Sequence, residues 1–232
     1  MQVESRWSGH NLYLAAIPPP EVAKRLFTAW LALGGDGRFR WQKLHLSILG
    51  LACARHVDAR LVAEVKETVG GLHLRPFEVR FDRFLPFGWG PDPRPLVFAG
   101  GTRNDRPDRL AGQLHEAIAG RRPDIGRRRR VVPHVTASYG AAFPGERPLP
   151  EPVCWQVTEL VLVDNWIGVP RYDHLARWPL RAGAVRPRAP ATQPAALQLE
   201  LPGLMRKPPP CAKIRVPRID RRDGIWDGNG WI

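Results

Sequence analysis

A short pattern of a histidine, one apolar residue and a hydroxyl residue occurs twice in this chain, and it constrains the fold more than any other feature. The first copy spans residues 45–47 (His-Leu-Ser) and the second spans residues 134–136 (His-Val-Thr). Both copies lie in apolar runs that predict β-strands, over residues 43–50 and 131–139. Residues two apart on a strand point to the same face, so each strand presents an imidazole beside a hydroxyl.

Two such strands placed against each other would form a nearly symmetric pocket. Histidine acts as an acid or a base near neutral pH, so His45 and His134 could take a proton from an attacking group and give one to a leaving oxygen. Ser47 and Thr136 could donate hydrogen bonds to phosphate oxygens, where charge develops in the transition state. This set of residues predicts metal-free hydrolysis of a phosphate ester, with no cofactor, and a cyclic phosphodiester is a natural substrate.

The remaining apolar patterns predict an α+β fold with antiparallel-rich sheets. The expected strands, besides the two motif strands, cover residues 12–17, 77–84, 95–99, 155–163 and 172–180. The expected helices cover residues 21–33, 58–69 and 107–118. The two halves share a coarse order, a helix-containing segment and then a motif strand. We therefore expect two lobes related by a pseudo-twofold axis, with outer helices and with motif strands that face a central cleft.

Composition changes after the last expected strand. Residues 1–181 form the predicted domain, whereas residues 182–232 are rich in proline and basic residues and predict a disordered or loosely attached tail. The formal net charge of +13 favours a polyanionic partner such as nucleic acid. The three cysteines fit neither a disulfide framework nor a metal site, and no apolar run is long enough to span a membrane. We expect a cytoplasmic monomer that does not bind membranes.

The motifs and their surroundings resemble one known family, the two-histidine phosphoesterases, and within it the RNA 2′,3′-cyclic phosphodiesterases, also called 2′-5′ RNA ligases. Five segments resemble those of the family: its opening strand and helix, first motif, middle strand and loop, second motif and closing strand. In this chain they are residues 11–22, 41–50, 76–88, 133–136 and 172–180. The resemblance therefore leaves out the tail.

The resemblance implies hydrolysis of a 2′,3′-cyclic phosphate at an RNA end to a 2′-phosphate, without metal. Carried over residue by residue, it makes His45 the acid that protonates the leaving 3′-oxygen and His134 the base that activates water. The two roles could be exchanged, because geometry decides between them. Ser47 and Thr136 would hold the phosphate, and the reverse reaction would join RNA ends through a 2′-5′ linkage.

Three further positions are candidate RNA contacts. Family members often carry an arginine where this chain has Tyr139, so the corresponding contact is missing or comes from elsewhere, such as Arg130 in the run 127–130. Tyr13 matches a position whose ring can stack on a base, or it is an ordinary core aromatic. Two other functions stay open: an RNA-binding protein that keeps the fold without turnover, and a phosphodiesterase for another cyclic or 2′-5′ nucleotide.

Overall fold

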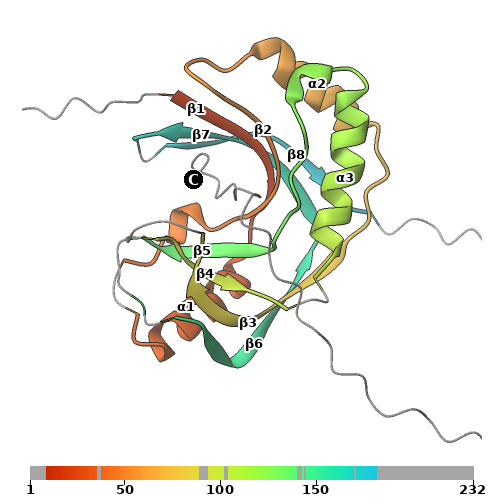
Figure 1. Cartoon of the computed structure of the whole chain (residues 1–232). Coiled ribbons are helices and arrows are strands. Elements are labelled where there is room, and N and C mark those ends of the chain that lie inside the picture. The colour runs from red at the N-terminus through yellow and green to blue at the C-terminus, as the bar shows by residue number, and fades with distance from the viewer. Residues whose placement is uncertain are drawn as a thin grey trace, which may run out of the picture. The chain divides into compact units, whose positions relative to one another are not determined.

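The structure is a computed structural model, and it describes residues 9–35, 38–88, 94–101, 104–139, 143, 145–169 and 171–181. The strands are β1 (Gly9–Ala16), β2 (Leu46–Ala54), β3 (Phe77–Pro86), β4 (Leu96–Ala99), β5 (His134–Ser138), β6 (Arg147–Val157), β7 (Glu159–Ile167) and β8 (Tyr172–Pro179). The α-helices are α1 (Pro20–Ala32), α2 (Ala59–Gly70) and α3 (Arg106–Ala119) (Figure 1). Two short 3₁₀ turns are η1 (Trp41–Lys43) and η2 (Pro123–Ile125). These elements confirm the predicted α+β class.

All eight strands belong to one antiparallel sheet with the order β6-β3-β4-β5-β2-β1-β7-β8. One half contains β2, β1, β7 and β8, and the other contains β5, β4, β3 and β6. The halves meet between the two motif strands, where a single residue pair, Leu46 with Val135, joins β2 to β5. The sheet is therefore almost divided along the line at which the two motifs meet.

The two halves repeat the same local topology. In one half β1, α1 and β2 follow one another, and in the other half β4, α3 and β5 do so; in both units the strands are neighbouring and antiparallel. The helix of each unit packs mainly against the other half of the sheet, α1 against β6 and α3 against β2. These helix contacts hold the two halves together, although only one residue pair connects their strands.

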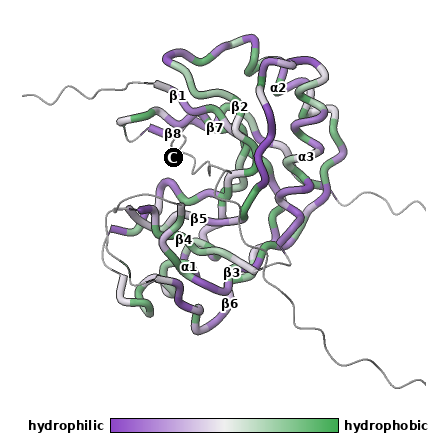
Figure 2. The backbone as a smooth tube through the Cα atoms, in the orientation of Figure 1, coloured by the Kyte–Doolittle hydropathy of each residue, from purple (hydrophilic) through white to green (hydrophobic). Residues whose placement is uncertain are grey.

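The helices form where a stripe of apolar residues follows a residue that favours the N-terminus of a helix. Pro20 opens α1 at a position where a missing N–H costs nothing, and Leu26 and Trp30 lie on the buried face of that helix. Asp58 caps α2 by accepting a hydrogen bond from the backbone N–H of Arg60 at 2.9 Å. Figure 2 shows hydrophobic and hydrophilic residues alternating along α2 and α3, as expected for helices with one face on a core.

The strand predicted over residues 155–163 was wrong, because two strands cover that region. β6 ends at Val157 and β7 begins at Glu159, and the two strands lie in different halves of the sheet. The beginning of β6 was missed because residues 147–152 contain three prolines, which usually argue against a strand. The prolines are tolerated because β6 is an edge strand and pairs only with β3, so one side of its backbone needs no partner.

The predicted tail, residues 182–232, lies outside the described residues. Among the residues that the structure describes, none of the helices has the length and apolar character required to cross a bilayer.

Candidate active site

The two histidine motifs meet in one strand pair. Leu46 and Val135, the middle residues of the two motifs, lie directly opposite each other in the antiparallel pairing of β2 with β5. In an antiparallel pair the flanking residues run in opposite directions. His45 is therefore the cross-strand neighbour of Thr136, and Ser47 is that of His134. Each imidazole thus lies across from the hydroxyl of the other motif.

The four polar side chains share one face of the sheet. Leu46 and Val135 are fully buried in the main hydrophobic core, and the residues beside them on each strand point to the opposite face. All four polar side chains are themselves buried, with exposed fractions of 7% for His45, 8% for Ser47, 6% for His134 and 4% for Thr136. Charges and hydrogen bonds act more strongly in such partly desolvated surroundings than in water.

Both imidazoles are oriented by the same hydrogen bond. His45 Nδ1 lies 2.8 Å from the backbone carbonyl oxygen of Lys43, and His134 Nδ1 lies 2.8 Å from that of Val132. A carbonyl oxygen can only accept, so Nδ1 carries the proton in each ring. Nε2 is then the basic nitrogen of each neutral imidazole. The structure therefore prepares both histidines in the same tautomer, although they lie in different halves of the chain.

The His45 imidazole is a poor proton acceptor in these surroundings. The pKa of His45 is lowered from its ordinary value of 6.5 to about 3, mainly by burial. The bond to the Lys43 carbonyl opposes this shift, and the charges of Arg40, His134 and Lys43 contribute to it. At neutral pH His45 is therefore uncharged. An anion bound beside it would work against this shift by favouring the protonated form.

Aromatic side chains pack around both histidines. Tyr13 and Tyr172 lie against His45, with ring centroids 5.2 and 5.7 Å from it, and their hydroxyls are hydrogen-bonded to each other. Phe87 lies against His134, with ring centroids 4.2 Å apart and planes inclined by 30°. Tyr13 and Phe87 belong to two small apolar clusters, separate from the main core. Each cluster limits the freedom of one imidazole ring.

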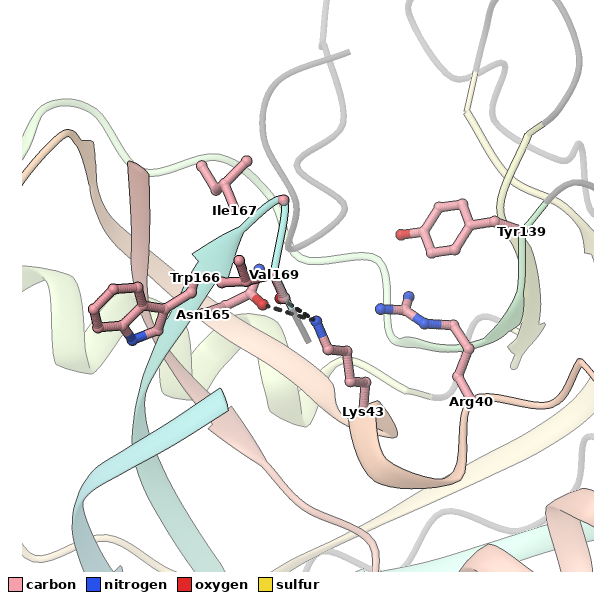
Figure 3. Close-up of a pocket in the computed structure, with 8 residues that line it drawn as sticks. Arg40, Lys43, Tyr139, Asn165, Trp166, Ile167 and Val169 are labelled. Carbon is pink, nitrogen blue, oxygen red and sulfur yellow. Dashed lines mark hydrogen bonds between the residues drawn. The ribbon is translucent and has the colours of Figure 1, made fainter. Parts of the chain in front are cut away.

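A hollow of about 370 Å³ lies beside the first motif. Its lining comes from both halves of the sheet: Arg40, Lys43, Tyr139, Asn165, Trp166, Ile167, Gly168 and Val169. Figure 3 shows the ends of the Arg40 and Lys43 side chains directed into the same space, between the end of β7 and Tyr139. The His45 imidazole is close enough for Arg40 and Lys43 to affect its protonation. The hollow therefore lies next to His45, which contacts the backbone of Lys43, although neither histidine lines it.

The three candidate RNA contacts have different surroundings. Tyr139 lines the hollow. Tyr13 is fully buried, and this favours its alternative role as a packed aromatic residue against His45. Arg130 is exposed, in the segment before β5, and it does not line the hollow. In the same basic run, Arg128 forms an ion pair with Asp108 of α3, so its charge is already compensated.

Sequence reasoning missed four residues around the histidines: Arg40, Lys43, Phe87 and Tyr172. Lys43 could have been found from its position two residues before His45, although it belongs to the turn η1 and not to a strand. Phe87 directly follows β3, and no local pattern connects it with His134. Among the described residues, no group of three or more histidine, cysteine or acidic side chains is arranged to hold a metal ion.

Comparison with solved structures finds the same fold in bacterial proteins. Escherichia coli LigT in its apo form matches with a TM-score of 0.59 and 20% identity, covering 75% of this chain and 98% of that protein. LigT complexed with 3′-AMP matches with a TM-score of 0.58 and 21% identity, covering 75% and 99%. TT0787 of Thermus thermophilus matches with a TM-score of 0.58 and 21% identity, covering 75% and 100%. No curated protein matches the chain at a significant level.

The family model of the 2′-5′ RNA ligase superfamily matches residues 18–165 of the chain. This span includes both histidine motifs and strands from both halves of the sheet, but not β1 or β8. It confirms the resemblance to the two-histidine phosphoesterases that the motifs suggested, and it supports a phosphoesterase activity. The chain therefore belongs to the 2′-5′ RNA ligase superfamily.

Proposed function

We propose that the protein hydrolyses a 2′,3′-cyclic phosphate at the end of RNA to a 2′-phosphate, and that His45 and His134 are the acid and base of the reaction. The observation that carries the proposal is the pairing of Leu46 with Val135, which sets the two imidazoles and two hydroxyls on one buried face. Both histidines come from one chain, so a monomer would suffice.

The reaction needs one proton acceptor and one proton donor. One imidazole takes a proton from water through Nε2 while the water oxygen attacks phosphorus. The bond from phosphorus to the 3′-oxygen breaks, and the other imidazole gives its proton to that oxygen. The product is a 2′-phosphate with a free 3′-hydroxyl. A correctly placed general acid or general base typically accelerates a reaction by about 10²- to 10⁴-fold.

The family resemblance makes His45 the acid, which requires His45 to carry a proton before the bond breaks. Burial and the neighbouring cations hold the pKa of His45 well below its ordinary value. A bound phosphate would bring negative charge to the site and raise that pKa, so substrate binding would prepare the acid. In the opposite assignment, the uncharged His45 would be the base. The pH dependence of kcat, which reports groups in the bound complex, separates the two assignments.

Ser47 and Thr136 are the proposed phosphate ligands. Each hydroxyl lies across the strand pair from the imidazole of the other motif, so a phosphate between the histidines could be reached from both strands. Hydrogen bonds to its oxygens would strengthen as charge develops in the transition state. Joining RNA ends through a 2′-5′ linkage would use the same groups in the same roles, with the 5′-hydroxyl of a second RNA in place of water. The base would take the proton of that hydroxyl as its oxygen bonds to phosphorus, and the acid would give a proton to the leaving 3′-oxygen.

The test is hydrolysis of an oligoribonucleotide with a 2′,3′-cyclic phosphate end, in EDTA, followed by phosphorus NMR of the product. We expect a 2′-phosphate from the wild-type protein and from His73→Ala, which removes an exposed histidine. We expect no product from His134→Ala, with an unchanged circular dichroism spectrum. A 3′-phosphate product, or turnover by His134→Ala at the wild-type rate, would refute the proposal. If the wild type shows no turnover and His134→Ala binds RNA as tightly as the wild type, a non-catalytic binding protein would be favoured.

A further inference from the structure

Among the described residues, neither Arg40 nor Lys43 forms an ion pair with a carboxylate, although both side chains are half-buried. Many of the other arginines are paired with acidic side chains: Arg60, Arg83, Arg109, Arg121, Arg122, Arg128, Arg171 and Arg177. Arg40 and Lys43 both line the hollow beside His45. Two cations without counter-charge in one hollow indicate that the missing charge comes from a ligand.

The backbone and the side chain of Arg40 each make a contact that leaves the charge of the guanidinium uncompensated. Its backbone N–H donates to the carbonyl oxygen of Ala137 at 2.9 Å, which ties the segment before η1 to the end of β5. Its guanidinium lies over the Tyr139 ring, 4.6 Å from the centroid. A guanidinium that contacts an aromatic ring in this way keeps N–H donors with which it can bind an anion.

Lys43 is held more loosely on the other side of the hollow. Its Nζ lies 3.4 Å from Asn165 Oδ1 and 3.5 Å from the carbonyl oxygen of Val169, at the end of β7. Both contacts are long for hydrogen bonds to an ammonium group, and both acceptors are neutral. Burial and the nearby charge of Arg40 lower the pKa of Lys43, so the two cations repel each other without a ligand. An anion between them would relieve this repulsion.

We propose that Arg40 and Lys43 form a second phosphate subsite, which binds the phosphodiester next to the reacting one and so makes an RNA strand, rather than a single nucleotide, the substrate. This inference rests on the proposed function, which puts the reacting phosphate between His45 and His134. The hollow of about 370 Å³ is within the range of pockets that bind small ligands and is lined by residues from both halves of the sheet.

Binding can be tested without turnover. The probe is a fluorescein-labelled hexaribonucleotide with a 2′-phosphate end, and its affinity is measured by anisotropy at several salt concentrations. We expect Arg40→Gln and Lys43→Gln each to weaken binding by about ten- to a hundredfold, as expected when a hydrogen bond to a charged group is removed. The slope of log affinity against log salt should become shallower by about 0.7 for each phosphate that the variant no longer neutralises.

Arg60→Gln is the matched control, because it removes the same charge from the exposed surface of α2. It should keep the affinity and the salt slope of the wild type. Arg40→Lys should recover part of the affinity, since it restores the charge but not the planar set of donors. Equal weakening by Arg60→Gln and Arg40→Gln would overturn the subsite, because general electrostatic attraction would then explain the weaker binding.

Kinetics test the substrate class. The three substrates are a nucleoside 2′,3′-cyclic phosphate, the same nucleoside with an added 5′-phosphate, and a dinucleotide ending in the cyclic phosphate. We expect Arg40→Gln to lower kcat/KM about ten- to a hundredfold for the dinucleotide and less than threefold for the simple nucleoside. Equal losses on both would overturn the proposal. An equal loss on the 5′-phosphate substrate and the dinucleotide would show that the subsite takes a phosphate on the 5′-oxygen without a second nucleoside. The phosphate subsite would then stand, and the assignment of an RNA strand as the substrate would be refuted.

The two proposals can fail separately. If the wild type hydrolyses none of the three substrates but loses hexamer affinity selectively in Arg40→Gln, the subsite stands and the proposed reaction fails. If the wild type hydrolyses them and Arg40→Gln changes neither affinity nor kcat/KM, the reaction stands and the subsite fails.

Discussion

The burial of His45 predicts that this one side chain makes the protein sensitive to mild acid. The pKa of His45 is lowered to about 3 by burial, against an ordinary value of 6.5 in an unfolded chain. Below about pH 6.5 the unfolded chain therefore takes up a proton that the folded protein does not. The proton stabilises the unfolded state, so the free energy of unfolding decreases as the pH falls from 6.5 towards 3.

The size of the effect follows from the same two values. By pH 4.5 the difference in proton uptake at His45 costs about 2 to 3 kcal/mol of folding stability, and at pH 7 it costs almost nothing. His45→Gln removes the group that titrates and keeps an N–H that can donate to the Lys43 carbonyl. We therefore expect the free energy of unfolding to fall between pH 7 and pH 4.5 by about 2 to 3 kcal/mol less in His45→Gln than in the wild type.

The assay is urea unfolding followed by tryptophan fluorescence at pH 7, 6, 5 and 4.5, with the m-value checked at each pH. His56→Gln, which removes an exposed imidazole, is the control and should follow the wild type. If His45→Gln and the wild type lose stability in parallel over this range, the inference that buried His45 stays uncharged is refuted.

Three further predictions test other parts of the structure. Leu114→Ala removes a fully buried side chain of α3 and should cost about 2 to 5 kcal/mol in urea unfolding, whereas Leu31→Ala, at a half-exposed position, should cost less than about 0.5 kcal/mol. Thr136→Val keeps the shape of the side chain but removes the hydroxyl, and it should lower kcat about 10²- to 10³-fold. Thr136→Ser should restore part of the activity. An unchanged kcat in Thr136→Val would show that the Thr136 hydroxyl does not bind the reacting phosphate. Phe87→Leu removes the ring beside His134 and should lower kcat with little change in KM, whereas Phe87→Tyr should retain most activity; equal kcat in both variants would refute a positioning role for the ring.

The fold class and the motif residues could be predicted because they depend on local patterns. Strand alternation places His45 and Ser47 on one face, as it does His134 and Thr136, whatever the rest of the chain does. The pairing of the two strands could not be derived from local patterns, since it depends on the packing of two distant segments. The resemblance to a known family supplied the expectation of a shared cleft. The pairing of Leu46 with Val135 in the structure shows the register in which the two motif strands meet.

The remaining errors and omissions have the same physical origin. The prolines of residues 147–152 oppose a strand in general, and they are compatible with one here because tertiary structure places that segment at the edge of the sheet. Arg40 could not be singled out among many arginines, because its lack of a carboxylate partner among the described residues and its contact with Tyr139 depend on which segments lie nearby. The basic run around Arg130 was the more conspicuous pattern in the sequence, but Arg128 is neutralised by Asp108.

The central claim is that His45 and His134 act as one acid–base pair, and a double-mutant cycle tests it most directly. The measurement is kcat/KM for a dinucleotide ending in a 2′,3′-cyclic phosphate, with the wild type, His45→Ala, His134→Ala and the double variant. If the histidines act as a unit, each single variant should lose about 10³-fold or more, and the double variant should lose little beyond that. Losses that multiply in the double variant, or a single variant that retains wild-type turnover, would contradict the account.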